Sequence, residues 1–121
     1  MLRKVLALAM ILAAPSLAHA QDAEAGKDVF KKCRACHAVG PDAKNKVGPQ
    51  LNGIVGRAAG TVDGFAYSEA MKNSGKTWDE ATLSAYLADP KGYIPGNKMV
   101  FAGLKDETDR KNLIAYLATN K

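Results

Sequence analysis

The chain has 121 residues, of which 47% are hydrophobic and 24% are charged, and its formal net charge is +5 at pH 7. This length suits one small domain rather than several. The charge is mildly basic, which by composition excludes a dedicated nucleic-acid binder while allowing a basic face. Only two cysteines are present, so no set of disulfides can brace a domain that buries limited surface.

The first twenty residues have the pattern of an export signal. Two basic residues precede an unbroken apolar run from Val5 to Ala14, and a small-x-small cleavage site ends at Ala20. Ten apolar residues are too few for a membrane anchor, because a spanning helix needs about 20. We predict cleavage after Ala20, which leaves a periplasmic domain of residues 21–121 with no stable membrane insertion.

The first predicted helix spans residues 22–32, and its first residue is an aspartate, a preferred N-cap. Ala25, Val29 and Phe30 have the spacing of one inward face. Gly26 is unfavourable inside a helix by about 1 kcal/mol relative to alanine. We therefore expect another backbone to pass close to Gly26.

The next stretch is Cys33-Arg34-Ala35-Cys36-His37, and the pattern Cys-x-x-Cys-His indicates attachment of a c-type haem. Each thiol can add across one vinyl group of the porphyrin, and His37 can then offer an imidazole nitrogen to the iron. Three alternatives rank lower. A redox dithiol normally accompanies a βαβ pattern, a zinc site needs four ligands, and a disulfide gives no reason for the adjacent histidine.

The following segment, residues 38–60, is rich in glycine and proline, which predicts a long loop. Loops of this length are uncommon unless they serve a function, and wrapping one side of a flat cofactor would explain this one. A short helix is expected around residues 67–73.

A further helix is predicted to open at a capping box formed by Thr77 and Glu80. Leu83 and Tyr86 fall on its inward face together with the leucine that follows. Pro90 closes this helix, since proline cannot continue it.

Residues 92–103 again read as a loop, and residues 106–118 as the last helix, with Ile114 and Leu117 on one face. No alternating run indicates a strand. The sequence therefore predicts an all-α domain with three main helices, short helices and long loops.

A haem iron held by His37 needs a second axial ligand for six-coordination. The mature chain has no second histidine, so a methionine thioether is the leading candidate. Met99 lies in a loop, a few residues after Pro95 and Gly96, and these two residues could fix the orientation in which the loop presents Met99. Met71 instead falls in a helical run. For Met99 alone, filling a gap in the core is about as expected as ligation, and the haem motif favours ligation.

Several segments beside the haem motif form a recognisable series. They are Gly26–Phe30, Val47–Leu51, Gly56-Arg57, Gly64–Tyr67, Thr77-Trp78, Tyr93–Phe101 and Leu113–Leu117. In order and nearly in spacing, over residues 22–118, they resemble the segments of a class I cytochrome c of the soluble bacterial and mitochondrial type. In that family the segments holding Gly26, Phe30 and Tyr116 form the contact between the first and last helices.

The resemblance implies the small cytochrome c fold, wrapped around one haem c that is covalently bound through Cys33 and Cys36. It implies His37 as the proximal iron ligand and Met99 as the distal one. It further implies that the backbone carbonyl of Pro49 accepts the other imidazole N–H, which would fix the tautomer and the ring plane.

Other matches concern the haem carboxylates and the distal side. Arg57, Tyr67 and Trp78 match residues that hydrogen-bond a haem propionate, and Tyr86 matches a tyrosine near the methionine sulfur. Ordinary roles, such as aromatic packing or a surface charge, are the alternative for each. Asn97 stands where the family commonly has threonine, so we expect a propionate bond from Asn97.

Met71 is a departure, because the family often has an asparagine there, within a polar network near the distal ligand. We expect Met71 to alter the reduction potential of the haem and to leave the iron ligands unchanged. With both axial positions filled, no open site remains for a substrate, so we predict a carrier and not an enzyme.

The predicted function is a soluble, monomeric one-electron carrier that cycles between Fe(II) and Fe(III). It would take electrons from a quinol–cytochrome c oxidoreductase and pass them to a terminal oxidase, a reaction centre or a reductase. One alternative is a haem-based sensor or weak peroxidase, if Met99 dissociates. Another is a dedicated subunit of a periplasmic dehydrogenase. By resemblance, the membrane partners dock on a ring of lysines: Lys32, Lys46, Lys91, Lys98 and Lys105.

Overall fold

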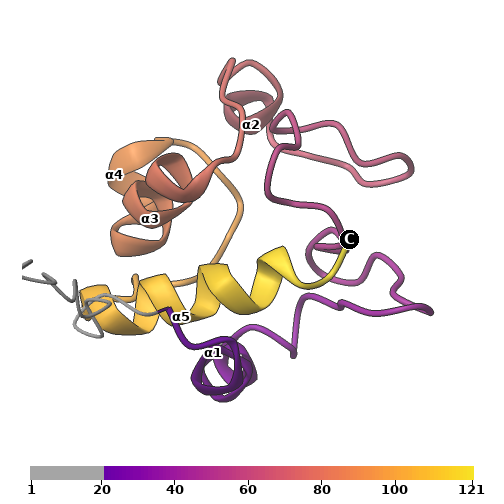
Figure 1. Cartoon of the computed structure of the whole chain (residues 1–121). Helices are drawn as coiled ribbons and strands as arrows, with labels where there is room; N and C mark the ends of the chain where they lie inside the picture. The colour runs from indigo at the N-terminus through magenta and orange to yellow at the C-terminus, as the bar shows by residue number, and fades with distance from the viewer. Residues whose placement is uncertain (1–20) are drawn as a thin grey trace, which may run out of the picture.

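The computed structural model describes residues 21–121, so the predicted signal, residues 1–20, lies outside the described residues. The elements are α1 (Ala23–Val29), η2 (Phe30–Lys32), α2 (Glu69–Lys72), α3 (Glu80–Ala88), α4 (Pro90–Tyr93) and α5 (Glu107–Ala118). Within the described part there is no strand, and Ala58 and Thr77 form an isolated bridge. The all-α class with three main helices, α1, α3 and α5, is confirmed (Figure 1).

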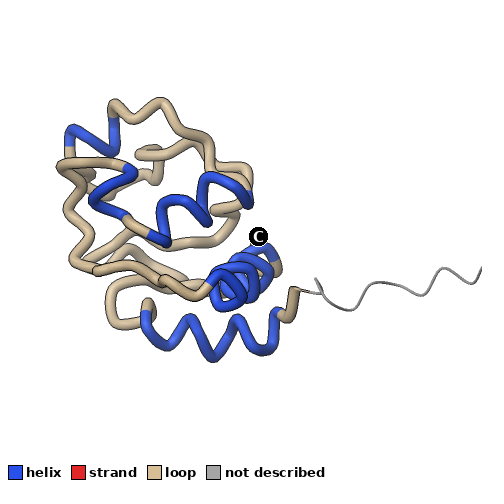
Figure 2. The backbone as a smooth tube through the Cα atoms, turned by 90° about the vertical axis from the view of Figure 1, so that its left-hand side faces the viewer, coloured by secondary structure: helices blue, strands red, loops and turns tan. Residues whose placement is uncertain are grey.

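The first and last helices cross and pack against each other, as two views at right angles show (Figures 1 and 2). Gly26 is buried at this crossing. A methyl group on its Cα would overlap the backbone carbonyl of Asn112 and lie 2.8 Å from Tyr116 Cβ. The rings of Phe30 and Tyr116 pack beside it, with centroids 5.6 Å apart. The expected close approach of a second backbone to Gly26 is therefore present.

The cap of α1 is the predicted one. The Asp22 carboxylate accepts hydrogen bonds from the N–H groups of Glu24 and Ala25 at 2.9 and 3.1 Å. The backbone N–H of Asp22 also donates to Asn112 Oδ1 at 3.0 Å. Because Asn112 belongs to α5, the same residue that begins α1 ties it to the last helix.

The structure corrects the predicted start of the next long helix. Asp79 is the N-cap of α3, and its carboxylate accepts from the Thr82 N–H at 2.8 Å while Thr82 Oγ1 accepts from the Asp79 N–H at 2.8 Å. The capping box expected from Thr77 and Glu80 is therefore wrong by two residues. Thr77 pairs in the bridge with Ala58, so its backbone is engaged outside the helix.

A second correction concerns the segment after α3. We predicted a loop from residue 92, but α4 occupies Pro90–Tyr93. Asp89 ends α3 and also caps α4, because its carboxylate accepts from the Gly92 N–H at 3.1 Å. Pro90 is suited to the first helical position, where no N–H is needed and its fixed φ already matches the helix. The short helix expected at 67–73 is found as α2, with Ser68 as its N-cap.

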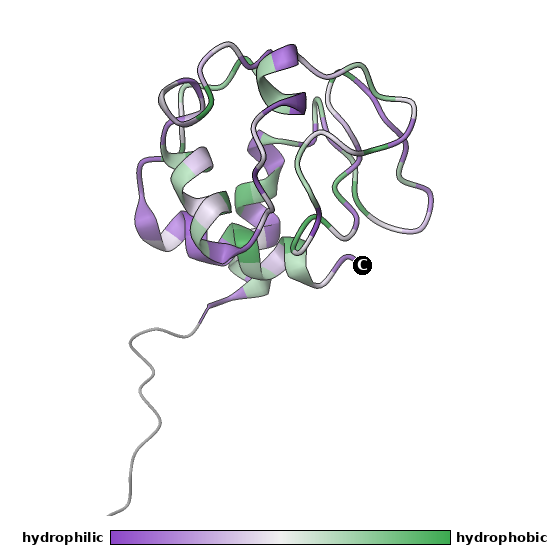
Figure 3. Ribbon diagram, turned by 90° about the horizontal axis from the view of Figure 1, so that it is seen from above, coloured by the Kyte–Doolittle hydropathy of each residue, from purple (hydrophilic) through white to green (hydrophobic). Residues whose placement is uncertain are grey.

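The remaining backbone is loop, and helices and loops together enclose the interior (Figure 1). α5 runs along one side of the interior, and α3 and α4 lie along a second side. The long segment between η2 and α2 covers the side opposite α3 and α4. The predicted inward face of α5 is buried at Ile114 and Leu117, and Leu113 is 1% exposed. Viewed from above, apolar positions of the helices gather where they overlap in the middle (Figure 3). None of the described helices has the length and apolar character to cross a membrane.

Candidate functional site

One cavity of about 730 Å³ lies at the centre of the domain. Its walls come from η2, the long loop, α2, α3, the segment after α4, and α5. Cavities that enclose organic cofactors measure roughly 300–1,000 Å³. The walls hold every residue that the sequence assigned to the site: Cys33, Cys36, His37, Pro49, Arg57, Tyr67, Trp78, Tyr86, Asn97 and Met99.

The two cysteines and the histidine share one tight turn. η2 ends at Cys33, and the Cys33 carbonyl accepts from the N–H groups of Cys36 and His37 at 3.1 and 2.9 Å. Both cysteines are half-buried free thiols. Burial raises the pKa of the Cys33 thiol, the neighbouring Cys36 raises this pKa further, and Lys32 opposes both. The turn thus brings two thiols and one imidazole to the same cavity wall.

The His37 ring is fixed on one edge. Its Nδ1 lies 2.7 Å from the carbonyl oxygen of Pro49. A carbonyl can only accept, so Nδ1 carries the hydrogen and Nε2 keeps a free lone pair in the neutral ring. Burial lowers the pKa of His37, and the Pro49 hydrogen bond opposes that shift in part. The neutral ring with a free Nε2 is the form that binds a metal.

Gly48 is a part of the site that sequence reasoning missed. It is buried against the imidazole, and a methyl group on its Cα would lie 2.8 Å from both His37 ring nitrogens. Any larger residue at this position would overlap the imidazole. The available signal was the place of Gly48 next to Pro49, within the segment Val47–Leu51 that resembles the family.

Met99 contacts Tyr86, a residue of α3, and both residues line the cavity. The Tyr86 hydroxyl donates to Met99 Sδ at 3.7 Å. Burial raises the pKa of Tyr86 to about 12, so the hydroxyl keeps its hydrogen at neutral pH. The Trp78 ring packs on Tyr86 with centroids 5.0 Å apart. The thioether therefore contacts a tyrosine that is itself held by packing against Trp78.

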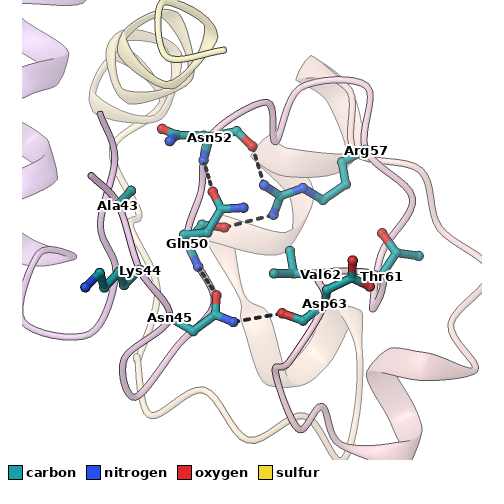
Figure 4. A pocket seen from close by; sticks show the side chains of 9 residues that line it. All are labelled: Ala43, Lys44, Asn45, Gln50, Asn52, Arg57, Thr61, Val62 and Asp63. Carbon is teal, nitrogen blue, oxygen red and sulfur yellow. Dashed lines mark hydrogen bonds between the residues drawn. The ribbon is translucent and has the colours of Figure 1, made fainter. Parts of the chain in front are cut away.

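Arg57 lines this cavity and also a second, polar pocket of about 550 Å³, which Figure 4 shows from close by. Its guanidinium donates to the carbonyl of Gln50 at 3.0 Å and to the carbonyl of Asn52. Asn45 lines the polar pocket as well. Its side chain accepts from the Gln50 N–H at 2.9 Å and donates to the Asp63 carbonyl at 3.0 Å. Two of the five guanidinium hydrogens are used in this way, so others stay available to an anion.

Tyr67 and Trp78 supply further donors to the cavity. The Tyr67 hydroxyl oxygen accepts from the Val62 N–H at 3.0 Å, which leaves the hydroxyl hydrogen free to donate elsewhere. Trp78 is 5% exposed, and its indole N–H can only donate. Together with Arg57, these groups match the needs of a partly buried carboxylate.

Asn97 differs from the expectation. Its side-chain amide donates to the carbonyls of Pro90 and Ile94, both at 2.8 Å. These two bonds use both amide hydrogens, so none is left for a haem carboxylate. The amide oxygen accepts from the backbone N–H of Met99 at 2.9 Å. The structure thus gives Asn97 a contact with the backbone of Met99 in place of the predicted propionate bond.

Three of the five predicted lysines, Lys32, Lys46 and Lys98, line the cavity, and all five are exposed. Lys91 lies on α4, and Lys105 donates to the Ala88 carbonyl at 2.7 Å beside the end of α3.

Two exposed valines line the cavity together with these lysines. Val47 is 79% exposed and Val100 is 96% exposed. Sequence reasoning passed over both, because a single exposed valine is normal and only the fold shows that the two share one cavity. The cavity is thus bordered by positive charge together with apolar side chains.

The donor set fits a haem c. A cavity with a mainly apolar lining offers two thiols and a neutral imidazole nitrogen from one turn, and a thioether from another segment. Thiols can form the thioether links, and imidazole with thioether is an axial pair used by cytochromes. The donors Arg57, Tyr67 and Trp78 suit the carboxylate groups of such a cofactor.

Comparison with known proteins gives a consistent picture. The family model described as Cytochrome c matches residues 23–121. Cytochrome c2 of Blastochloris viridis is 55% identical over 117 residues, which cover 97% of this chain and 92% of that protein. Cytochrome c-550 of Bradyrhizobium diazoefficiens is 58% identical over 96 residues, covering 79% of this chain and 71% of that protein.

Solved structures are similar in fold as well as in sequence. Cytochrome cH from Methylobacterium extorquens aligns with a TM-score of 0.78 and 51% identity, over 82% of this chain and 99% of that chain. Cytochrome c2 from Rhodospirillum centenum aligns with a TM-score of 0.79 and 42% identity, over 82% of this chain and 98% of that chain.

Proposed function

Since the chain belongs to the cytochrome c family and is an electron carrier with covalently bound haem c, we propose that His37 and Met99 are its two iron ligands. When bound, the haem supplies reversible one-electron chemistry between Fe(II) and Fe(III). The observation that carries the proposal is the Tyr86–Met99 contact at 3.7 Å, in the same cavity as the Cys33–His37 turn.

The protein side chains then have separate tasks. Cys33 and Cys36 form the thioether links. The Pro49 carbonyl orients His37 and makes its Nε2 a stronger donor. The soft thioether of Met99 favours Fe(II), which raises the reduction potential relative to two nitrogen ligands.

The haem carboxylates would lie against a polar wall. We assign them to Arg57, Tyr67 and Trp78, each of which lines the cavity and has a hydrogen to donate. Arg57 is held by two backbone carbonyls, so little side-chain freedom remains to be lost when it binds an anion. These donors offset the cost of bringing negative charge into a largely apolar cavity.

An optical experiment tests the assignment of the ligands. The spectrum of the oxidised holoprotein should contain a sulfur-to-iron charge-transfer band, and carbon monoxide should leave the reduced spectrum unchanged. Both results are expected if His37 and Met99 fill the two axial positions. A missing band together with a clear carbon monoxide shift would instead mean an open iron, and a sensor or weak peroxidase would replace the carrier.

We propose that residues 1–20 are a cleaved export signal, and that the mature carrier is a soluble monomer in the periplasm. Covalent haem attachment in bacteria takes place outside the cytoplasmic membrane, and this agrees with export. The mature domain would begin at Gln21, next to the N-cap Asp22. Mass spectrometry of the purified holoprotein gives the first residue directly.

The partners are proposed to be membrane redox complexes with an acidic docking surface. Lys32, Lys46 and Lys98 line the cavity and are exposed, so their summed field would steer an acidic surface toward the haem. Val47 and Val100 lie among them and provide apolar contact. A small interface of this kind suits electron-transfer partners that bind the carrier only briefly.

Neutralising the three cavity lysines tests this docking face. The triple variant Lys32→Gln, Lys46→Gln and Lys98→Gln should associate with an acidic redox partner about tenfold more slowly at low salt, because steering depends on charge. The rate should also depend less steeply on ionic strength. Stopped-flow electron transfer measures both quantities.

The matched control removes the same amount of charge from lysines outside the cavity lining: Lys27, Lys111 and Lys121. Its association rate should fall much less than that of the cavity variant. Equal slowing by the two triple variants would show that net charge matters and that the proposed face does not.

A further inference from the structure

The methionine assigned as iron ligand is carried by a segment with little backbone support. Residues 98–103 lie between α4 and α5, and none of their N–H groups donates to a backbone carbonyl of the described chain. At the far end, the Leu104 N–H donates to the Leu87 carbonyl at 2.7 Å. Lys105 Nζ donates to the Ala88 carbonyl, also at 2.7 Å. The segment is therefore a strap whose C-terminal end is fixed to α3.

The N-terminal end of the strap is fixed mainly by the buried side chain of Asn97, and the exposed Lys98 Nζ adds a longer bond of 3.3 Å to the Ala66 carbonyl. Asn97 is 6% exposed, and its amide bridges three backbone groups. It donates to the carbonyls of Pro90 and Ile94 at 2.8 Å, and it accepts from the Met99 N–H at 2.9 Å. Pro90 opens α4 and Ile94 ends it, so the amide joins the strap to both ends of this short helix.

The helix that serves as the anchor is itself well held. Pro90 is among the fully buried side chains, and Asp89 caps the helix through the Gly92 N–H. Ile94 is 4% exposed. A buried hydrogen-bonding group linked to such an anchor transmits its position to the next residues, because breaking the link leaves the part-buried Met99 N–H without its partner.

The bond from Asn97 to Met99 spans two residues, which is a local side-chain-to-backbone turn. It sets the backbone of Met99, while Tyr86 contacts the sulfur of the same residue at 3.7 Å. We propose that Asn97 is a positioning residue that holds Met99 against the iron and disfavours its release. This inference rests on the proposed function, because it takes Met99 as the ligand.

Asparagine is suited to this role by its chemistry. A side-chain amide has two donor hydrogens and an acceptor oxygen. In Asn97 both hydrogens and the oxygen are used in hydrogen bonds. A threonine hydroxyl has a single hydrogen and cannot bridge both carbonyls and the N–H at once. Asn97→Thr should therefore loosen Met99 partly, and Asn97→Ala should loosen it fully.

The experiment measures how easily an added ligand displaces Met99. In the ferric holoprotein, Asn97→Ala should bind imidazole about tenfold more tightly than the parent, since each lost hydrogen bond weakens the closed state. The backbone N–H of Met99 should exchange with solvent at least about tenfold faster. The sulfur-to-iron band should weaken. Asn97→Thr should fall between the parent and Asn97→Ala.

A matched control separates positioning from general destabilisation. Asn52 also clamps a loop with its amide, accepting from the Gly40 N–H at 2.8 Å and donating to the Gly40 carbonyl at 2.7 Å. It lines the polar pocket and not the haem cavity. Asn52→Ala should leave the imidazole affinity within about twofold of the parent, because it leaves every contact of Asn97 in place.

The outcomes are distinct. If the parent has the sulfur band and Asn97→Ala keeps both that band and the parent imidazole affinity, the positioning role is wrong. If Asn97→Ala and Asn52→Ala raise the affinity equally, the effect is general loosening and the role is also wrong. If Asn97→Ala does not fold, the affinity and exchange of Asn97→Thr decide. A parent protein without the band would reject Met99 as ligand, which is a failure of the proposed function.

Discussion

Replacing Met99 by leucine is expected to abolish the sulfur-to-iron band of the oxidised protein and to let carbon monoxide bind the reduced protein. Leucine has nearly the volume of methionine, so the part of the folding free energy that comes from side-chain packing should fall by less than about 1.5 kcal/mol. What is lost is the soft sulfur ligand. The reduction potential should fall by on the order of 0.1 V, within the range of about 0.8 V that axial ligands span.

Met71 provides the control for this substitution, because it is the other methionine of the predicted mature chain and lines the same cavity. Met71→Leu should retain the sulfur band and exclude carbon monoxide. Absorption spectra and a redox titration of the two purified variants compare them directly. Loss of the band in Met71→Leu with its retention in Met99→Leu would assign the sulfur ligand to Met71.

The largest effect on stability is expected at Gly26. Alanine favours a helix by about 1 kcal/mol over glycine, but its methyl group would overlap the Asn112 carbonyl and crowd Tyr116. The obstacle is backbone, which cannot move aside as a flexible side chain can. Separating two packed helices should outweigh the helical preference and reduce the free energy of unfolding by about 3 kcal/mol.

Guanidinium unfolding of the holoprotein measures this effect. The control is Lys27→Ala, an exposed position next to Gly26 in the same helix, which should change stability by no more than about 0.5 kcal/mol. A Gly26→Ala variant as stable as the parent would show that α1 and α5 can move apart at little cost.

The elements that could be predicted from the sequence are those whose signals are local. Asp22 caps α1 because a carboxylate sits one residue before a helical run. Gly26 was predicted to meet another backbone because it violates helix preference without a local reason. The haem motif is five adjacent residues. In each case the sequence signal lies within one or two turns of chain.

Other features depended on resemblance to a family. The partners of His37 and Met99 are Pro49 and Tyr86, each more than ten positions away. No periodicity connects such pairs. The family pattern supplied both pairs because it records which segments meet in three dimensions.

The mispredicted features arise from competition between partners. Thr77 had the right spacing for a cap, but its backbone pairs with Ala58, which the local pattern does not show. Asn97 was expected to bind a carboxylate, but its amide hydrogens go to the carbonyls of Pro90 and Ile94, which lie closer along the chain and accept backbone N–H groups as well. A polar residue has a choice of partners, and the folded chain decides which is nearest.

The crossing of α1 and α5 also determines when the domain can fold. Asp22 and Asn112, joined by a hydrogen bond of 3.0 Å, are 90 positions apart. Closing so long a loop costs entropy before any contact repays it. A chain that emerges from the ribosome with α1 first has no partner for that helix until α5 has been made. The packing of α1 against α5 therefore forms only after the last helix has been synthesised.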